Sequence, residues 1–244
     1  LYISNNIGDT GATLTVNTLI SDQAYGMPPV ARQPQNHTFE TNDARVLAGF
    51  MENDKIQFVG NTIDTVSGNA TFYHGIVSDV SSSPTIHLTI ITDTLDFGYP
   101  NLSYTGDNAG DNSCIITVTH SSNKVYAGFS AFYFDGNGEY SQRITIKQGT
   151  SIVNMLSGVY ERWGDYSGSQ RKYNEPGLVW ASGSFGKLAQ IGYYNYRLFG
   201  TSIARLIKPG FVDIQDLAAK SFDFNAFPNP ANDIVTLEFN LSSD

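Results

Sequence analysis

The amino-acid sequence predicts an all-β fold, and three observations point to it. Aromatic residues make up 13% of the 244 residues, and Thr, Ser and Asn are abundant beside 23 Gly. Aromatic and β-branched side chains suit the pleated, half-buried surface of a strand. Charged residues are only 15%, against about 25% in an average soluble chain. Short apolar or alternating runs bounded by Gly, Asn, Asp or Pro recur along the chain, which is typical of strands joined by tight turns.

Seven of these runs have the length and composition of strands. The first alternates apolar residues with smaller or polar ones, which predicts a strand with one buried face. A turn is expected at Asp135-Gly136-Asn137-Gly138, because Gly and Asn accept positive φ at low cost. The only short helix that the pattern predicts lies at Asp213–Lys220. The expected strands are Ala12–Leu19, Lys55–Val59, Thr71–Val77, Thr85–Ile91, Ile115–Thr119, Val125–Phe134 and Ser141–Ile146.

A near-repeat indicates that the strands are organised in similar units. The segment Tyr99–Tyr104, interpreted as an aromatic turn, leads into the apolar run Cys114–Val118. The segment Trp163–Gly168 leads in the same way into Leu178–Ser182, and its first residue lies 64 positions after Tyr99 (163 − 99 = 64). In both copies a Ser stands at the same offset. Each unit is therefore expected to pair an aromatic turn with an apolar strand.

A third, less regular copy starts at Tyr25–Pro28. The stretch Arg162–Gly168, with Pro176–Gly183 and Gly200–Ala204, resembles a terminal blade of the sialidase-like β-propellers of secreted bacterial proteins. The resemblance covers residues 160–207 and implies propeller-like blades over residues 1–207. Only about three blades fit this length, whereas closed propellers have at least four. Either further blades precede residue 1, or the sheets form an open or sandwich-like stack. We expect the missing blades, because an unclosed three-blade array would expose sheet edges.

Residues 208–226 read as a linker, and a distinctive motif follows it. Phe227-Pro228-Asn229-Pro230-Ala231 contains two prolines, each of which fixes φ and lacks an N–H donor. The motif leads into a run in which Val235, Leu237 and Phe239 alternate with polar residues. This alternation predicts a strand with one apolar face, as in a small β-sandwich. The residues that form the expected signal are Phe227, Pro228, Asn229, Pro230, Ala231, Asp233, Leu237 and Phe239.

This motif resembles the start of a type A sorting domain of the Bacteroidetes type IX secretion system, over residues 227–244. The resemblance implies a cargo that enters the periplasm by the Sec route. It also implies two partners, the outer-membrane translocon and its shuttle protein. The mature protein is then expected outside the cell or on its outer surface. The alternative interpretation of the motif is an ordinary proline-rich linker.

Charge and residue counts argue against several kinds of partner and site. The net charge of −9 disfavours nucleic acid and anionic lipid, and no run approaches the ~20 apolar residues of a membrane-spanning helix. The single cysteine, Cys114, cannot form an intrachain disulfide, and its apolar surroundings predict a buried, inert thiol. Because the four histidines are scattered, a zinc site is not expected. These are His37, His74, His87 and His120.

For the body of the protein, two hypotheses remain open: a non-enzymatic adhesion or ligand-binding module, and a sialidase-like glycoside hydrolase. The hydrolase would need clustered arginines for a carboxylate and two positioned catalytic groups. The Ser-x-Asp-x-Gly-x-Thr-Trp turns of that family are absent, so the binding module is favoured and no catalytic residue is assigned. Trp163, Asp165 and Tyr166 are interpreted as a structural turn, in which Asp165 accepts backbone N–H bonds and Trp163 packs between blades. The residues that catalysis could use are Arg143, Arg162, Arg171, Arg197, Arg205, Glu161, Asp165, Glu175 and Tyr166.

Two further segments have binding interpretations. Tyr193, Tyr194 and Tyr196 could stack on the rings of a glycan or another cell-surface ligand, or could pack in the core. The loop Asp107–Asn112 is rich in the oxygen ligands that Ca²⁺ prefers, yet such loops also form turns without metal. Apart from Ca²⁺ near Asp107 and Asp111, no cofactor is expected.

Overall fold

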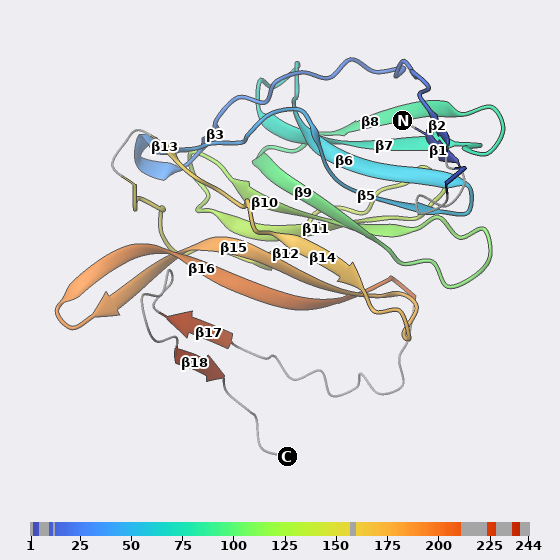
Figure 1. The fold of residues 1–244 in the computed structure, drawn as a ribbon. Coiled ribbons are helices and arrows are strands. Elements are labelled where there is room, and N and C mark those ends of the chain that lie inside the picture. Colours follow the sequence, from blue (N-terminus) through green and yellow to red (C-terminus); the bar gives the residue numbers. More distant parts are fainter. Residues whose placement is uncertain are drawn as a thin grey trace.

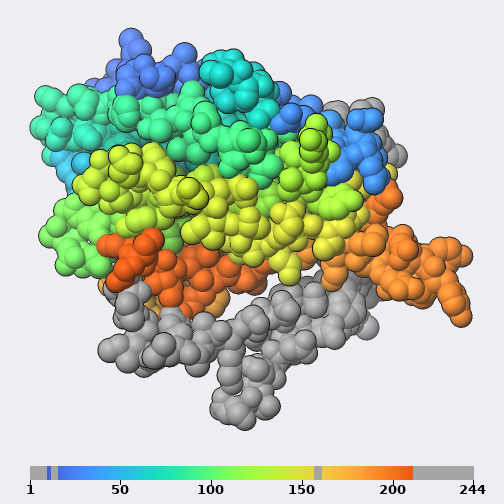
Figure 2. Space-filling model, turned by 180° about the vertical axis from the view of Figure 1, so that it is seen from behind, coloured from blue at the N-terminus to red at the C-terminus, as the bar shows by residue number. Residues whose placement is uncertain are grey.

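Three antiparallel sheets, stacked as successive layers, form the body of the molecule (Figure 1). The computed structural model describes residues 2–4, 10–11, 13–156, 160–210, 224–227 and 236–239. The described chain is all-β, as predicted, and none of its sheets closes into a barrel. Figure 2 shows the same layering from the opposite side, with the tip of one long hairpin projecting beyond the body.

The layers follow one another along the sequence. The first sheet has the order β5-β6-β7-β8 and the second the order β9-β10-β11-β12, and the third has the order β14-β15-β16. Strands adjacent in sequence are thus adjacent in each sheet. The first sheet contains β5 (Val46–Glu52), β6 (Lys55–Ile63), β7 (Ala70–Ser78) and β8 (Thr85–Ile91). The second contains β9 (Asp96–Tyr104), β10 (Cys114–Ser121), β11 (Gly128–Phe134) and β12 (Ile144–Lys147), and the third contains β14 (Gly168–Arg171), β15 (Leu178–Ile191) and β16 (Tyr194–Ile207).

Smaller sheets accompany this body. A short parallel pairing joins β13 to β4, and β3 completes that sheet. Two further antiparallel pairs are β1 with β2 and β17 with β18. A single 3₁₀ turn, η1 (Pro34–Asn36), separates β3 from β4. The bounds are β1 (Tyr2–Ser4), β2 (Thr13–Thr15), β3 (Ala31–Arg32), β4 (Thr38–Phe39), β13 (Tyr160–Glu161), β17 (Phe224–Phe227) and β18 (Thr236–Phe239).

Strands β9 to β11 of the second sheet are buried along most of their length on both faces, whereas its edge strand β12 is partly exposed. All eight residues of β10 are buried, and its sequence CIITVTHS is correspondingly apolar for most of its length rather than strictly alternating. Towards the first sheet, Ile116 and Val118 share a core with Val59 and Phe72. Towards the third sheet, Ile115 packs with other small and aliphatic residues. The second sheet is therefore the layer that connects the other two.

Glycines in the strands let aromatic rings approach a neighbouring sheet closely. A Cβ at Gly183 of β15 would lie 2.2 Å from the ring of Phe129 in β11. A Cβ at Gly98 of β9 would lie 3.1 Å from the ring of Trp163. Trp163 is 1% exposed and stacks on Phe39 with ring centroids 4.7 Å apart. Trp163 is therefore buried between β9 and the β3–β4 sheet, whereas the predicted packing between propeller blades stays a prediction.

A buried carboxylate ties three elements together. Asp96, 1% exposed at the start of β9, accepts hydrogen bonds from the backbone N (2.8 Å) and Nε (2.7 Å) of Arg32 in β3. Its other oxygen accepts from the backbone N–H of Ala70 in β7 at 3.2 Å. An unpaired buried charge would cost several kcal/mol, so Arg32 must stay docked on the stack.

Most predicted strands are present with shifted ends, but some assignments were wrong. Ala12–Leu19 forms a strand only at Thr13–Thr15 among its described residues. Tyr99–Tyr104 is not a turn: it belongs to β9, with an irregularity where Tyr99 takes φ 51°. Pro100 is tolerated there because β9 is the edge strand of its sheet.

Other assignments concern turns and the C-terminal region. The turn at Asp135–Gly138 is confirmed, with Gly136 at φ 87° and the Asp135 side chain accepting the N–H of Asn137. β18 lies where the motif predicted a strand, whereas β17 begins inside the expected linker and ends at Phe227, the first residue of the motif. The helix expected at Asp213–Lys220 lies outside the described residues.

We predict that two buried histidines make the fold sensitive to mild acid. Burial lowers the pKa of His74 from 6.5 to about 3 and that of His120 from 6.5 to about 4. Below about pH 6.5 the unfolded chain binds protons on these rings while the folded chain does not. The free energy of unfolding should therefore fall as the pH drops from about 6.5 towards 4, by up to about 1.4 kcal/mol per pH unit for each ring.

Urea denaturation across this pH window measures the effect. The double variant His74→Gln/His120→Gln should show a flatter dependence on pH, whatever its stability at neutral pH. Asn123→Gln, at an exposed position without a titrating group, should keep the wild-type slope. A double variant with the wild-type slope would contradict the assignment.

Candidate functional site

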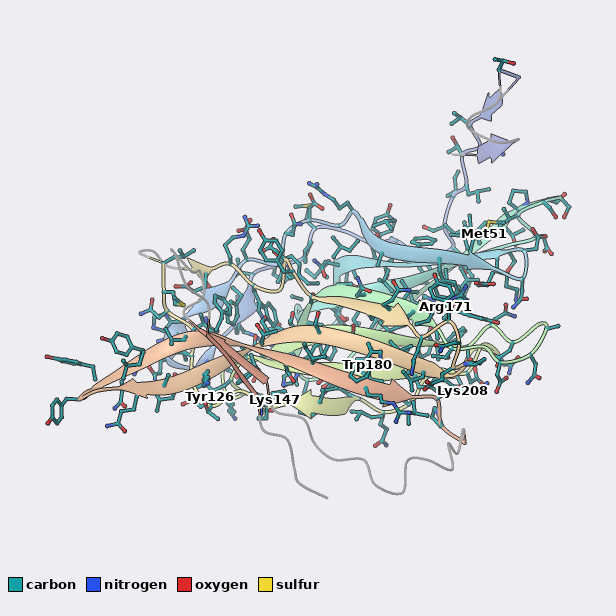
Figure 3. The ribbon with its side chains drawn as sticks, turned by 60° about the horizontal axis from the view of Figure 1, so that its bottom comes forward. Met51, Tyr126, Lys147, Arg171, Trp180 and Lys208 are labelled. Atoms are coloured by element: carbon teal, nitrogen blue, oxygen red, sulfur yellow. The ribbon has the colours of Figure 1, made fainter. Side chains whose placement is uncertain are left out.

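A cleft opens where the first strands of the three sheets meet. β5, β9 and β14 each begin a sheet, and β9 contacts both of the others. The cleft has a volume of about 380 Å³ and is lined by residues of all three strands and by Tyr173, just after β14. Clefts of a few hundred Å³ with convergent polar groups are the usual form of small-ligand sites. Met51 and Arg171, contributed by the first and third sheets, lie towards the same end of the stack (Figure 3).

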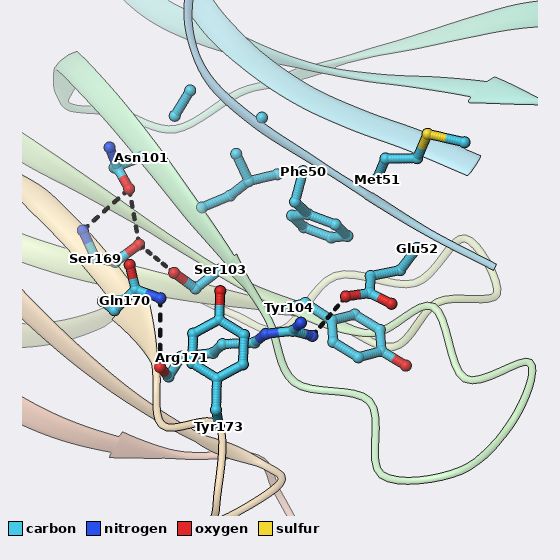
Figure 4. Close-up of a pocket in the computed structure, with 13 residues that line it drawn as sticks. Phe50, Met51, Glu52, Asn101, Ser103, Tyr104, Ser169, Gln170, Arg171 and Tyr173 are labelled. Atoms are coloured by element: carbon cyan, nitrogen blue, oxygen red, sulfur yellow. Dashed lines mark hydrogen bonds and ion pairs between the residues drawn. The ribbon is translucent and has the colours of Figure 1, made fainter. Parts of the chain in front are cut away.

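The most distinctive group in the cleft is a stacked arginine. The guanidinium of Arg171 lies 4.3 Å from the ring centre of Tyr173 and 5.3 Å from that of Tyr104. Its Nη1 forms an ion pair with Glu52 Oε1 at 2.6 Å. Figure 4 shows Arg171 between the two rings, with the contact to Glu52 dashed. A cation over an aromatic face is favourable by about 0.5–2 kcal/mol, so these four side chains hold one another in place.

Burial alone would lower the pKa of the Arg171 guanidinium. Its interactions with Tyr173 and Glu52 outweigh that effect and raise the pKa above its already high ordinary value. The group is thus permanently charged, and Glu52 balances that charge within the cleft.

The opposite wall of the cleft is a row of amides and hydroxyls. Asn101 Oδ1 accepts hydrogen bonds from the backbone N (3.0 Å) and Oγ (2.8 Å) of Ser169. Ser103 Oγ lies 2.8 Å from Ser169 Oγ. These bonds cross from β9 to β14 and fix the two strands relative to each other. They also orient the Asn101 amide, so that its Oδ1 faces Ser169 and its Nδ2 points away from it (Figure 4).

The local sequence explains how Tyr104 is held. Its hydroxyl donates to the carbonyl of Asp111 at 2.9 Å. A Cβ at Gly106 would lie 2.0 Å from that hydroxyl oxygen, so the ring can occupy this position only because residue 106 is glycine. Phe50 packs on the ring with centroids 5.6 Å apart.

A second hollow, of about 500 Å³, lies beside Trp163 and Phe199 and is mostly apolar. Trp163 Nε1 and Glu161 Oε2 have no hydrogen-bond partner in the described chain, but both atoms are sealed from solvent. A ligand in the hollow could not reach them without moving the wall. The cleft between β5, β9 and β14 is therefore the better candidate site.

The tyrosines expected to bind a ligand lie elsewhere. Tyr193, Tyr194 and Tyr196 sit at the tip of the β15–β16 hairpin and are 99%, 71% and 43% exposed. The hairpin turn lies at the end of the molecule opposite Arg171 (Figure 3). Packing in the core, the alternative interpretation, does not fit these exposures. Ligand binding by these tyrosines stays a prediction.

The arginines considered for catalysis do not converge. Arg143 pairs with Asp93 (3.0 Å), Arg162 with Asp165 (2.5 Å) and Arg171 with Glu52. Arg197 donates to Gln35, and Arg205 lies 3.8 Å from Glu175. Each of these five arginines therefore interacts with a different part of the chain, and they do not converge on one site.

The turn that contains Asp165 differs in detail from its prediction. Asp165 is held by the Arg162 guanidinium and not by backbone N–H groups. The turn is closed instead by the backbone bond from Ser167 N to Gly164 O at 2.9 Å. Tyr166 is 98% exposed.

A lysine occupies the loop considered for calcium. Lys208 Nζ lies 2.5 Å from Asp111 Oδ2 and 3.2 Å from Asp107 Oδ1. Burial alone would raise the pKa of the Asp111 carboxyl, but hydrogen bonds from Lys208 and Ser113 bring it well below its usual range. Among the described residues, no group of three His, Cys, Asp or Glu side chains has the geometry of a metal site.

Cys114 is fully buried, as predicted, and burial raises the pKa of its thiol.

The residues of the C-terminal motif are only partly described. Phe227 is the last residue of β17 and pairs with Thr236 of β18. Leu237 and Phe239 also lie in β18. Pro228, Asn229, Pro230, Ala231 and Asp233 lie outside the described residues.

Comparisons with known proteins identify nothing. No family model, no curated protein and no solved structure matches this chain. The described part of the chain has no helix with the length and hydropathy of a membrane span. Function must therefore be argued from the cleft and from the sequence motifs.

Sequence reasoning named Arg171 but missed Glu52, Tyr104 and Tyr173. The near-repeat could have indicated the site, because its two copies lie at β9 and at the start of β14. These strands begin successive sheets and lie side by side. Treating Tyr99–Tyr104 as a turn concealed that signal.

We predict that Lys208 fastens the end of the third sheet to the β9–β10 loop. Lys208→Met should lower the free energy of unfolding by roughly 1.5–3 kcal/mol, since charged hydrogen bonds are lost and two carboxylates remain. Urea denaturation at neutral pH measures the change. Lys124→Met, at an exposed position, is the matched control and should stay within about 0.5 kcal/mol of wild type. Equal losses in both variants would contradict this role.

Proposed function

We propose that this chain is a cargo of the type IX secretion system. In this proposal a propeller-like module binds a ligand outside the cell or on its outer surface, and a C-terminal segment serves as the export signal. The observation that carries the export part is the motif Phe227-Pro228-Asn229-Pro230-Ala231 with the alternating strand after it. The partners in export are the outer-membrane translocon and its shuttle protein.

The C-terminal strands are compatible with this assignment. β18 covers Thr236–Phe239, and its antiparallel partner β17 ends at Phe227, where the motif begins. Residues 228–235 are thus the connection in sequence between two paired strands. Proline suits such a connection because it fixes φ and needs no hydrogen-bond acceptor for an N–H.

The binding module is supported by the arrangement of the body. β-Propellers place four-stranded antiparallel sheets around a central channel. Here three consecutive sheets keep sequence order, and their first strands line a common cleft. This is the arrangement expected if the cleft is one side of such a channel.

A binding role is preferred to hydrolysis because of the charged groups. The hydrolase alternative needs several arginines aimed at one carboxylate. The arginines of the described chain are each paired with a different carboxylate or amide, and the one in the cleft is balanced by Glu52. No observation favours hydrolysis over binding.

We predict that the C-terminal region exports a passenger. A Sec-targeted fluorescent reporter, followed by the region from Lys208 to the natural C-terminus of the protein, should reach the medium or the cell surface. This should happen in a type IX-competent host and fail in a translocon mutant, where the reporter should accumulate in the periplasm. Deletion from Phe227 onward should have the same effect, and Pro228→Ala/Pro230→Ala should reduce export.

Pro209→Ala, a proline substitution outside the motif, is the matched control and should leave export unchanged. Release that depends on neither the motif nor the translocon would overturn the proposal and make residues 227–244 an ordinary linker and strand.

A further inference from the structure

The charge balance of the cleft restricts its ligand. Arg171 is the only cationic side chain that lines it among the described residues, and Glu52 already lies 2.6 Å from its guanidinium. An anionic ligand would have to displace Glu52 or bind beside it, at a cost in repulsion. A cationic ligand would meet the guanidinium. A neutral ligand meets neither penalty.

The polar groups left free in the cleft both donate and accept. Asn101 keeps its Oδ1 occupied by Ser169, which turns its Nδ2 into an oriented donor. Gln170 is exposed, and its amide makes only a 3.5 Å contact within the described chain, to the carbonyl of Arg171. Glu52 Oε2 and the remaining guanidinium N–H groups add one more acceptor and further donors. Planar amide, carboxylate and guanidinium groups of this kind match pairs of adjacent hydroxyls, each of which donates and accepts.

An open aromatic face lies next to these groups. Tyr173 is 73% exposed although one side of its ring is covered by Arg171. The exposed part of the ring therefore includes its side away from Arg171, and Tyr173 is one of the residues that line the cleft (Figure 4). The apolar C–H face of a pyranose ring can stack on such a surface, and Asn101 and Gln170 line the same cleft. The guanidinium behind the ring holds it in position.

We propose that this cleft binds a neutral saccharide, with Tyr173 as the stacking platform and Glu52 as the residue that excludes acidic sugars. The inference rests on the proposed binding function and names its ligand class. Asn101 and Gln170 contact hydroxyl groups, and Arg171 serves as a positioning residue for Tyr173.

A smaller hollow of about 190 Å³ shares Tyr104, Arg171 and Tyr173 with the cleft. The Arg171–Tyr173 stack therefore lines two adjoining spaces. A disaccharide with one ring in each space would contact both, so we expect disaccharides to bind more tightly than monosaccharides.

Calorimetry with the purified chain tests the proposal. The neutral probes are lactose and cellobiose, with methyl galactoside as the shorter probe. Sialyllactose and glucuronic acid are the acidic probes. At physiological salt, lactose or cellobiose should bind, and the acidic probes should bind at least tenfold more weakly. Tyr173→Ala should weaken binding of the neutral probe roughly tenfold.

Variants that neutralise charged residues of the cleft test its selectivity for neutral saccharides most directly. Glu52→Gln frees Arg171 and should raise affinity for the acidic probes roughly tenfold or more. Glu52→Gln/Arg171→Gln should lose that gain. Asp93→Asn is the matched control, because it frees Arg143 outside the cleft, and it should leave selectivity unchanged. Thermal unfolding of each variant confirms that it is folded.

Four results would overturn the proposal. Tighter binding of sialyllactose than of lactose by the wild-type protein would reverse the inferred selectivity. Loss of saccharide binding in Tyr193→Ala/Tyr194→Ala, with Tyr173→Ala unaffected, would move the site to the hairpin tip. Binding to whole cells that depends on Tyr173, with no affinity for any saccharide probe, would refute the ligand class and leave the proposed binding function intact. If the protein bound neither whole cells nor any saccharide probe, the proposed binding function itself would be refuted.

Discussion

Burial of strands β9 to β11 of the second sheet on both faces is the constraint on which the rest of this structure depends. A sheet with two apolar faces is unstable unless a layer covers each of them, and here the first and third sheets do so. β10 has no exposed residue. Gly183 lets the ring of Phe129 fill the space between the second and third sheets, and Gly98 lets Trp163 pack between β9 and the β3–β4 sheet. The volumes of these side chains and the positions of the glycines together set the distances between the sheets.

The candidate site is a consequence of this stacking. No single sheet contains the cleft, because Glu52 comes from the first sheet, Asn101 from the second and Arg171 from the third. The hydrogen bonds of Asn101 to Ser169 and the Arg171–Glu52 pair cross the layer boundaries. The ring of Tyr104 completes the group from the edge strand of the buried sheet. Binding chemistry and fold stability are therefore linked at β9.

The sequence predicted the local structure better than the assembly. Runs such as Thr85–Ile91 are recognisable as strands because β-branched residues lie between Pro and Asp, and Asp135–Gly138 is recognisable as a turn. β9 was missed because Pro100 argues against a strand, and only its edge position in the sheet makes the proline acceptable. The cleft could not be predicted, since residues 52, 101 and 171 meet only after three sheets have stacked. Tyr193 and Tyr194 drew attention through composition, but composition does not reveal that they lie on a projecting hairpin.

Native-state hydrogen exchange would test most directly whether the second sheet controls the body. Amides of β10 should exchange only through global unfolding, with the largest protection free energies in the chain. Trp163→Ala should lower protection in all three sheets together, because they share one stack. Faster exchange in β10 than in β7 or β15, or a loss confined to the third sheet, would contradict the account. The layers would then be independent units, and the cleft between them would not be a fixed site.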